Sequence, residues 1–161
     1  MVYLARDAPD FSEYKTFINS KEGFALVQEI QEIEKNRPAA AAAAPGFDLR
    51  EELTDHMMET YGKKSHGHFT KKIKSPNDII DLCVKSIKDN SNSWYYIGIY
   101  GPYGGHGIAV RTTRHGVNLF DPNLGEFRFN DLTDLIGYIA SVFIEKYNTT
   151  NAMWISRYKK T

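Results

Sequence analysis

Apolar residues recur every three or four positions through the first half of the chain, which is the spacing of an amphipathic helix. The pattern predicts helices over residues 1–20, 21–36 and 48–61, and another from Ser75 to about Asn90. The residues expected to face a core are Phe11, Tyr14, Phe17 and Ile18, then Phe24, Val27, Ile30 and Ile33 or Leu26, then Leu49, Leu53, Met57 and Tyr61, and finally Ile79, Leu82, Cys83 and Ile87. The segment Ala39–Ala44 lies between prolines, so we expect a low-complexity surface connection or an engineered replacement of a mobile loop.

The second half of the chain changes to the alternation that is typical of β-strands. Strands are predicted at 93–100, on both sides of a turn within 106–121, at 126–129 and at 151–159. One helix interrupts them, capped by Asn130 or Asp131 and ending near Tyr147, and its inward residues should be Leu132, Leu135, Ile136, Ile139, Val142 and Phe143. Helices followed by an antiparallel sheet indicate an α+β fold in one domain.

The two strands within 106–121 carry a histidine and an aspartate that could meet. If a four-residue loop at 112–115 joins the strands, His106 lies opposite Asp121, on the face that also holds Ile108, Val110, Val117 and Leu119. Opposed Cβ atoms are about 4.5–5.5 Å apart, and a carboxylate that holds one imidazole nitrogen leaves the other as a base. A two-residue turn at His115–Gly116 is equally compatible and would break the pair. Both residues are also ordinary turn residues.

The sequence motifs of this region favour a functional His106–Asp121 pair over two ordinary turn residues. The segments Gly104–Val110 (GGHGIAV) and Phe120–Phe127 (FDPNLGEF) closely resemble the His and Asp blocks of the YopT-type cysteine proteases, which are papain-like bacterial effectors with a Cys-His-Asp triad. The resemblance is strong over residues 94–130 and diffuse elsewhere. It implies a papain-like fold, with N-terminal helices packed on an antiparallel sheet, and catalytic roles for His106 and Asp121 without a cofactor or a metal.

The resemblance also implies a place of action. It suggests a secreted bacterial effector or toxin that acts in the host cytosol on a host protein, for which a small GTPase is one candidate, or that processes itself. The loop Gly101–Gly105 delivers His106, and its glycines would let a substrate backbone approach the base, unless the loop is a plain hairpin connection.

The nucleophile of such a triad is missing from its expected place. Cys83 is the only cysteine, and its position in the middle of a helix, on an apolar face, predicts a buried, slowly reacting thiol. The opening VYLARDAPDF resembles the end of the family's Cys-bearing helix, so residues 1–161 are expected to form a domain without the start of that helix. Two functions remain open. One is a protease cut short, or a deamidase or acyltransferase that uses the same triad; the other is an inactive module that binds a host protein.

The amino-acid composition limits the classes of partner that the chain is expected to bind. Lysine plus arginine equals aspartate plus glutamate, 20 each, which argues against a nucleic-acid binder. No apolar run approaches the ~20 residues of a membrane span, and one cysteine permits neither an internal disulfide nor the usual cysteine zinc site. The basic stretch 63–74 could meet an anionic membrane or partner, but a solvated loop and edge strand is favoured. His66 and His68 within it are weak evidence for a metal site.

Overall fold

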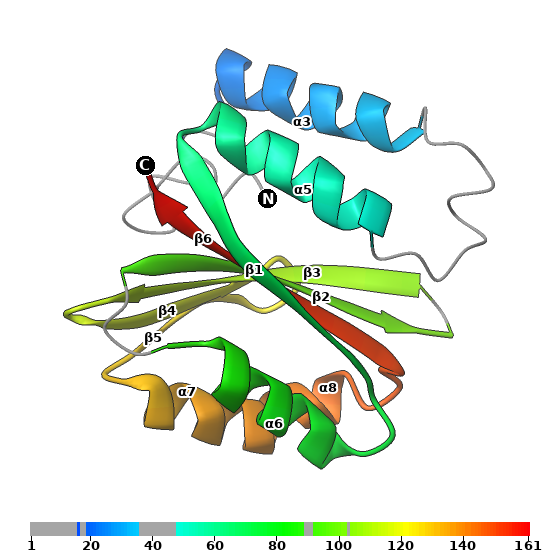
Figure 1. Ribbon diagram of the computed structural model, residues 1–161, viewed down its shortest axis with the longest axis vertical. Helices are drawn as coiled ribbons and strands as arrows, with labels where there is room; N and C mark the ends of the chain where they lie inside the picture. The colour runs from blue at the N-terminus through cyan, green and yellow to red at the C-terminus, as the bar shows by residue number, and fades with distance from the viewer. Residues whose placement is uncertain (1–15, 17–18, 36–47, 89–91, 103) are drawn as a thin grey trace.

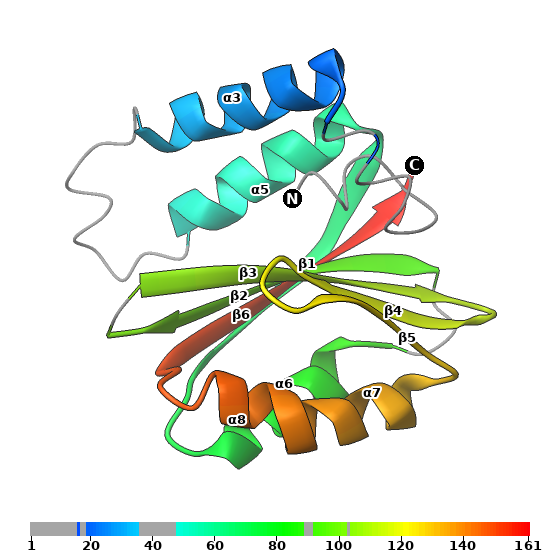
Figure 2. The same cartoon turned by 180° about the vertical axis from the view of Figure 1, so that it is seen from behind.

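The computed structural model describes residues 16, 19–35, 48–88, 92–102 and 104–161. In these ranges a six-stranded antiparallel sheet is covered by helices on both faces (Figures 1 and 2). The α+β prediction is therefore confirmed. The helix expected within 1–20 and the segment Ala39–Ala44 lie outside the described residues. Among the residues that are described, no helix is both long and apolar enough to cross a membrane.

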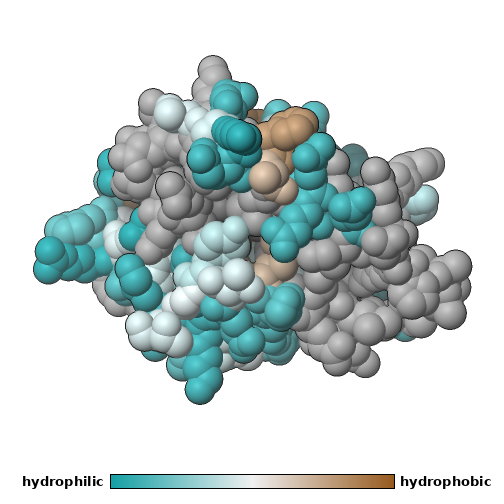
Figure 3. Space-filling view, turned by 90° about the horizontal axis from the view of Figure 1, so that it is seen from above, coloured by the Kyte–Doolittle hydropathy of each residue, from teal (hydrophilic) through white to brown (hydrophobic). Residues whose placement is uncertain are grey.

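Each helix keeps to one side of the sheet. On one side lie α3 (Lys21–Lys35) and α5 (Asp48–Thr60), side by side in both views. On the other side lie α6 (Pro76–Ser86), α7 (Leu132–Tyr138), the π-helix η1 (Ile139–Phe143) and α8 (Ile144–Lys146). Seen from above α3 and α5, the described surface is mostly hydrophilic with one small hydrophobic group (Figure 3), as expected for an outer layer.

The sheet runs in the order β1-β6-β2-β3-β4-β5, so the first strand pairs with the last. The strands are β1 (Lys63–Lys72), β2 (Ser93–Gly101), β3 (Gly104–Thr113), β4 (Gly116–Asp121), β5 (Gly125–Phe129) and β6 (Ala152–Lys160). β2 is central, as its run of aromatic and β-branched residues predicts. The basic stretch forms the edge strand β1, as predicted.

Two cores result from the alternation of side chains across this sheet. The larger one lies against α6, α7 and η1, and includes Tyr95, Ile97, Ile108, Val110, Val117, Leu119, Met153 and Ile155. The smaller one lies against α5, and its buried residues are Met58, Trp94, Ala109, Phe120 and Tyr158. Both faces of the central strands are therefore buried. His106 belongs to the face of the larger core, because it is separated from Ile108 by one strand period.

Three details differ from the sequence prediction. Phe24 is 61% exposed although it was expected to face a core, whereas Val27 of the same predicted face is partly buried. Lys63 is buried although the basic stretch was expected to be solvated, since its ammonium group lies 5.1 Å from the centre of the Trp94 ring. α6 ends at Ser86, several residues early, where Ile87 adopts an extended conformation.

The last helix also departs from prediction at Val142, which is 44% exposed although it was expected to face inward. The cause is the π-helix η1, in which the backbone N–H of Ile144 bonds to the carbonyl of Ile139, five residues back. A π-turn holds more residues than an α-turn, so every fourth residue stays on one face. Leu135, Ile139 and Phe143 are buried accordingly, and Val142 turns outward.

Candidate active site

His106 and Asp121 meet on the sheet, as predicted, but in a different register. A two-residue turn, Arg114–His115, joins β3 and β4, and Val110 pairs with Leu119 rather than with Val117. This shift of two residues keeps every side chain on its predicted face but makes His106 and Asp121 diagonal neighbours. Diagonal positions remain within reach of long or aromatic side chains. Nε2 of His106 donates a hydrogen bond of 2.9 Å to Oδ1 of Asp121.

The turn that follows Asp121 explains the sequence motif Asp-Pro-Asn-x-Gly. The backbone N–H of Asn123 donates to Oδ1 of Asp121 at 2.7 Å, and that of Leu124 donates to the Asp121 carbonyl at 3.1 Å. Such an aspartate turn holds the carboxylate by its own backbone. Gly125 has φ +106°, which favours glycine, and it returns the chain into β5. The turn therefore fixes the carboxylate at the end of β4.

Tyr147 completes the site, and sequence reasoning did not anticipate its role. Its ring stacks on the His106 imidazole, with centroids 5.1 Å apart and planes at 20°. Its hydroxyl donates to Oδ2 of Asp121 at 2.5 Å. Tyr147 directly follows α8 and lies four residues after Phe143. The π-helix that turns Val142 outward therefore also keeps Tyr147 on the same face as the buried residues. Its sequence position gave no indication of this contact.

Burial and hydrogen bonding act against each other on the carboxylate. Burial alone would raise the pKa of Asp121, but hydrogen bonds from His106, Tyr147 and the backbone of Asn123 outweigh it and lower the pKa below its usual value. Burial, together with the bond to this carboxylate, raises the pKa of Tyr147. Asp121 is therefore an anion at neutral pH, and Tyr147 is a neutral donor to it.

The two members of the pair differ in access to solvent. The Asp121 side chain is 0% exposed and the His106 side chain is 20% exposed. Among the described residues, Nδ1 of His106 has no hydrogen-bond partner. A buried carboxylate that holds one ring nitrogen of a partly exposed imidazole is the arrangement of an oriented general base.

A family model described as Yersinia/Haemophilus virulence surface antigen, Peptidase_C58, matches residues 19–154, most of the chain. The chain belongs to this family of YopT-type cysteine proteases. Among solved structures, the crystal structure of Pseudomonas avirulence protein AvrPphB is similar, with a TM-score of 0.74 and 16% identity, over 98% of this chain and 87% of that one. This likeness shows the papain-like fold. A search of curated proteins finds no match.

Cys83 stands apart from the chemistry of a YopT-type protease. The residue is 1% exposed within the larger core, among Ile79, Leu82 and Ile87, which confirms its predicted burial. Burial raises the pKa of its thiol to about 12. At neutral pH this thiol is protonated and shielded from solvent, so it is not a nucleophile.

The glycines near His106 have a packing role on the opposite face of β3. A Cβ at Gly105 would lie 2.4 Å from the Tyr100 ring, and one at Gly107 would lie 2.5 Å from the Tyr96 hydroxyl. In the loop itself, Gly101 pairs with Gly104 across a short hairpin connection. The plain hairpin is thus what the described part of the loop forms, and neighbouring tyrosines account for glycine at 105 and 107.

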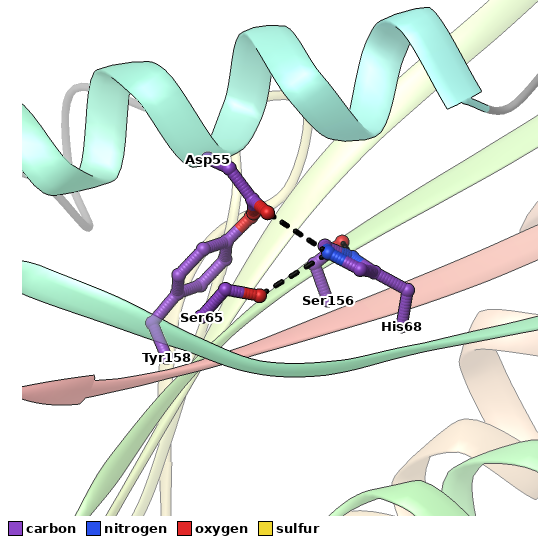
Figure 4. Close-up of polar contacts among 5 residues, drawn as sticks. All are labelled: Asp55, Ser65, His68, Ser156 and Tyr158. Carbon is purple, nitrogen blue, oxygen red and sulfur yellow. Dashed lines mark hydrogen bonds and ion pairs between the residues drawn. The ribbon is translucent and has the colours of Figure 1, made fainter.

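A second histidine takes part in a triad-like cluster (Figure 4). Nε2 of His68 lies 3.0 Å from Oδ2 of Asp55, and Nδ1 lies 2.8 Å from Oγ of Ser156. Ser65 and Tyr158 join the cluster through bonds to His68 and Asp55. However, Ser156 is 0% exposed and cannot meet a substrate. The cluster therefore ties α5 to β1 and β6.

The cluster accounts for one of the two histidines of the basic stretch, His68. A bulge between Ser65 and His68, with Gly67 at φ +118°, turns both of these side chains to the α5 side. His66 is exposed and does not take part in the cluster. Over the described ranges, no three histidine, cysteine, aspartate or glutamate side chains gather as a metal site would require.

Proposed function

We propose that this chain is the protease domain of a bacterial virulence effector, with His106 as the base and Asp121 as its orienting partner. The proposal is carried by one observation: a partly exposed imidazole is held at Nε2 by a fully buried carboxylate. Membership of the YopT-type family supports the reaction class. A host protein is the expected substrate, and a small GTPase is one candidate for it.

The proposed mechanism uses Nδ1 of His106, the ring nitrogen that Asp121 does not hold. In the proposed reaction Nδ1 of His106 takes the proton of a cysteine thiol, and Asp121 stabilises the imidazolium that forms. The resulting thiolate attacks the carbonyl carbon of the scissile bond, and the C–N bond breaks as the imidazolium gives its proton to the leaving amine. Water, deprotonated by His106, then hydrolyses the thioester and releases the acid product and the thiol. Since Cys83 is buried and protonated, we propose that the thiol belongs to a longer form of the protein.

The test compares the 161-residue chain with the full product of its gene, using self-cleavage and cleavage of proteins in host lysate as readouts. We expect activity only in the longer form. There, His106→Ala should lower the rate by roughly a hundredfold to ten-thousandfold, because it removes the base. Asp121→Ala should cost less, because Asp121 orients the base and does not react.

Cys83→Ala is the matched control, since it removes the only thiol of the 161 residues without touching the proposed pair. It should leave the activity of the longer form unchanged. Cleavage by the 161-residue chain that survives His106→Ala would show that the active site lies elsewhere. Loss of activity in a folded Cys83→Ala variant would show that the nucleophile is misassigned.

A second candidate function is favoured by the same burial of Cys83. If no longer form supplies a thiol, the chain keeps the fold and serves as an inactive module that recognises a host protein. The same comparison distinguishes the two functions. The binding module predicts that the full gene product has no activity and that its host partner binds equally well to the His106→Ala variant.

A further inference from the structure

A large cavity lies at the far end of the β3–β4 hairpin from His106. Its volume is about 510 Å³, which is in the range of small-molecule sites. Its lining is polar and basic: Asn92, Arg111, Thr113, Arg114, His115, Asn118 and Arg128. Three of these seven residues are arginines and none is acidic. Such a lining selects for anions.

The strand pairing places two of the arginines on either side of a neutral amide. Arg111 on β3 pairs with Asn118 on β4, and Asn118 pairs with Arg128 on β5. The two arginine backbones are therefore two strand spacings apart, about 9.5 Å. Arginine side chains from such positions can reach separate groups of one ligand. Arg114 adds a third positive charge in the turn that joins β3 to β4.

Within the part of the chain that the structure describes, no carboxylate pairs with these arginines. Glu126 neighbours the cavity, where it accepts a bond of 3.4 Å from Asn118, but it does not line the cavity. Nε of Arg114 donates to Nε2 of the neighbouring His115 at 2.8 Å, a bond that involves no carboxylate.

Arg111 provides the strongest indication of a ligand. Its guanidinium lies 5.3 Å from the centre of the Trp94 ring, which holds the side chain in place. Its Nε is buried, and no described residue accepts a hydrogen bond from it. A buried charged donor without an acceptor is costly, and a bound oxyanion would satisfy it.

We propose that this cavity binds a ligand with two or more linked phosphate groups. Guanidinium groups bind phosphate oxygens in a bidentate manner, and three arginines match several negative charges. The site is separate from the proposed active site. Arg111 lies on the face of the smaller core and His106 on the other, and residues 106 and 113 are roughly 23 Å apart along β3 at 3.3 Å per residue.

Tripolyphosphate is the soluble probe for this site, and binding to the 161-residue chain can be followed by calorimetry. Replacing two exposed arginines, Arg114→Gln with Arg128→Gln, should weaken binding at least about tenfold, since each charged hydrogen bond is worth roughly 1.5–3 kcal/mol. The matched control is Lys72→Gln with Lys85→Gln, two exposed lysines outside the cavity. It removes the same net charge and should bind as the parent chain does.

Vesicles distinguish the two sources of such phosphates. Phosphatidylcholine vesicles with a phosphoinositide that carries two ring phosphates are compared with phosphatidylcholine and phosphatidylserine at equal charge. Arginine-dependent binding to the first alone indicates a lipid headgroup, and tripolyphosphate binding without vesicle binding indicates a soluble ligand. No binding to either probe overturns the proposal. So does equal weakening by the arginine and lysine pairs, because it would indicate general attraction between charges.

Discussion

The replacement Tyr147→Phe removes one hydrogen bond from the His106–Asp121 pair and leaves the rest of the site in place. The hydroxyl of Tyr147 donates to Oδ2 of Asp121, whose side chain is fully buried. The Phe ring keeps the stacking on His106 and the contact with Phe143, whose ring centroid is 4.7 Å away. The free energy of unfolding should therefore report on the hydroxyl alone.

A hydrogen bond to a charged group contributes about 1.5–3 kcal/mol, and we expect a loss of that size at pH 7. For a chain of this length, each kcal/mol lowers the melting temperature by about 2–4 °C. The loss should shrink in acid. Because the folded-state pKa of Asp121 is lowered, its stabilisation is complete above the unfolded-state pKa and disappears as the pH falls through the folded-state value.

Urea unfolding at a series of pH values, followed by tryptophan fluorescence, measures this difference. Tyr138→Phe is the matched control. Its hydroxyl is buried and has no hydrogen-bond partner among the described residues, so removing it should be neutral or slightly stabilising. If Tyr147→Phe were as stable as the parent chain at pH 7, or if the gap between them widened in acid, the carboxylate would not be held by Tyr147 as the structure indicates.

The elements of the fold could be predicted because each follows a clear period. The alternation over 93–100 gave the central strand, and the helical spacing around Cys83 gave its burial. The shared face of His106 and Asp121 was also predictable, since shifting a hairpin by two residues changes partners and keeps faces. The register was not predictable, because the turn residues Arg114 and His115 carry no strong preference of their own.

Other features depend on contacts between distant segments. The burial of Lys63 rests on Trp94, which is remote in sequence and belongs to another strand. Tyr147 reaches Asp121 only because a π-helix changes the face that follows it, and apolar spacing does not reveal such a turn. The cation-lined cavity likewise requires the pairing of three strands. Sequence periodicity indicates which face a residue occupies but not which neighbours it meets there.

Two predictions concern the cores. Native Cys83 should resist a mild thiol reagent at pH 7 and react in urea, because its thiol is buried and has a pKa of about 12; rapid labelling of the folded chain would contradict its placement. Gly98→Ala should lower the free energy of unfolding, measured in urea, by about 1–3 kcal/mol or more. The new Cβ would lie 2.1 Å from the Trp154 ring, and strands β2 and β6 cannot separate without losing their hydrogen bonds. Gly137→Ala in helix α7 is the control. A Cβ added there would meet no described atom within 4 Å beyond its own helix backbone, so alanine should stabilise the chain by about 0.5–1 kcal/mol. Equal effects of the two substitutions would mean that β2 and β6 do not approach as closely as the structure places them.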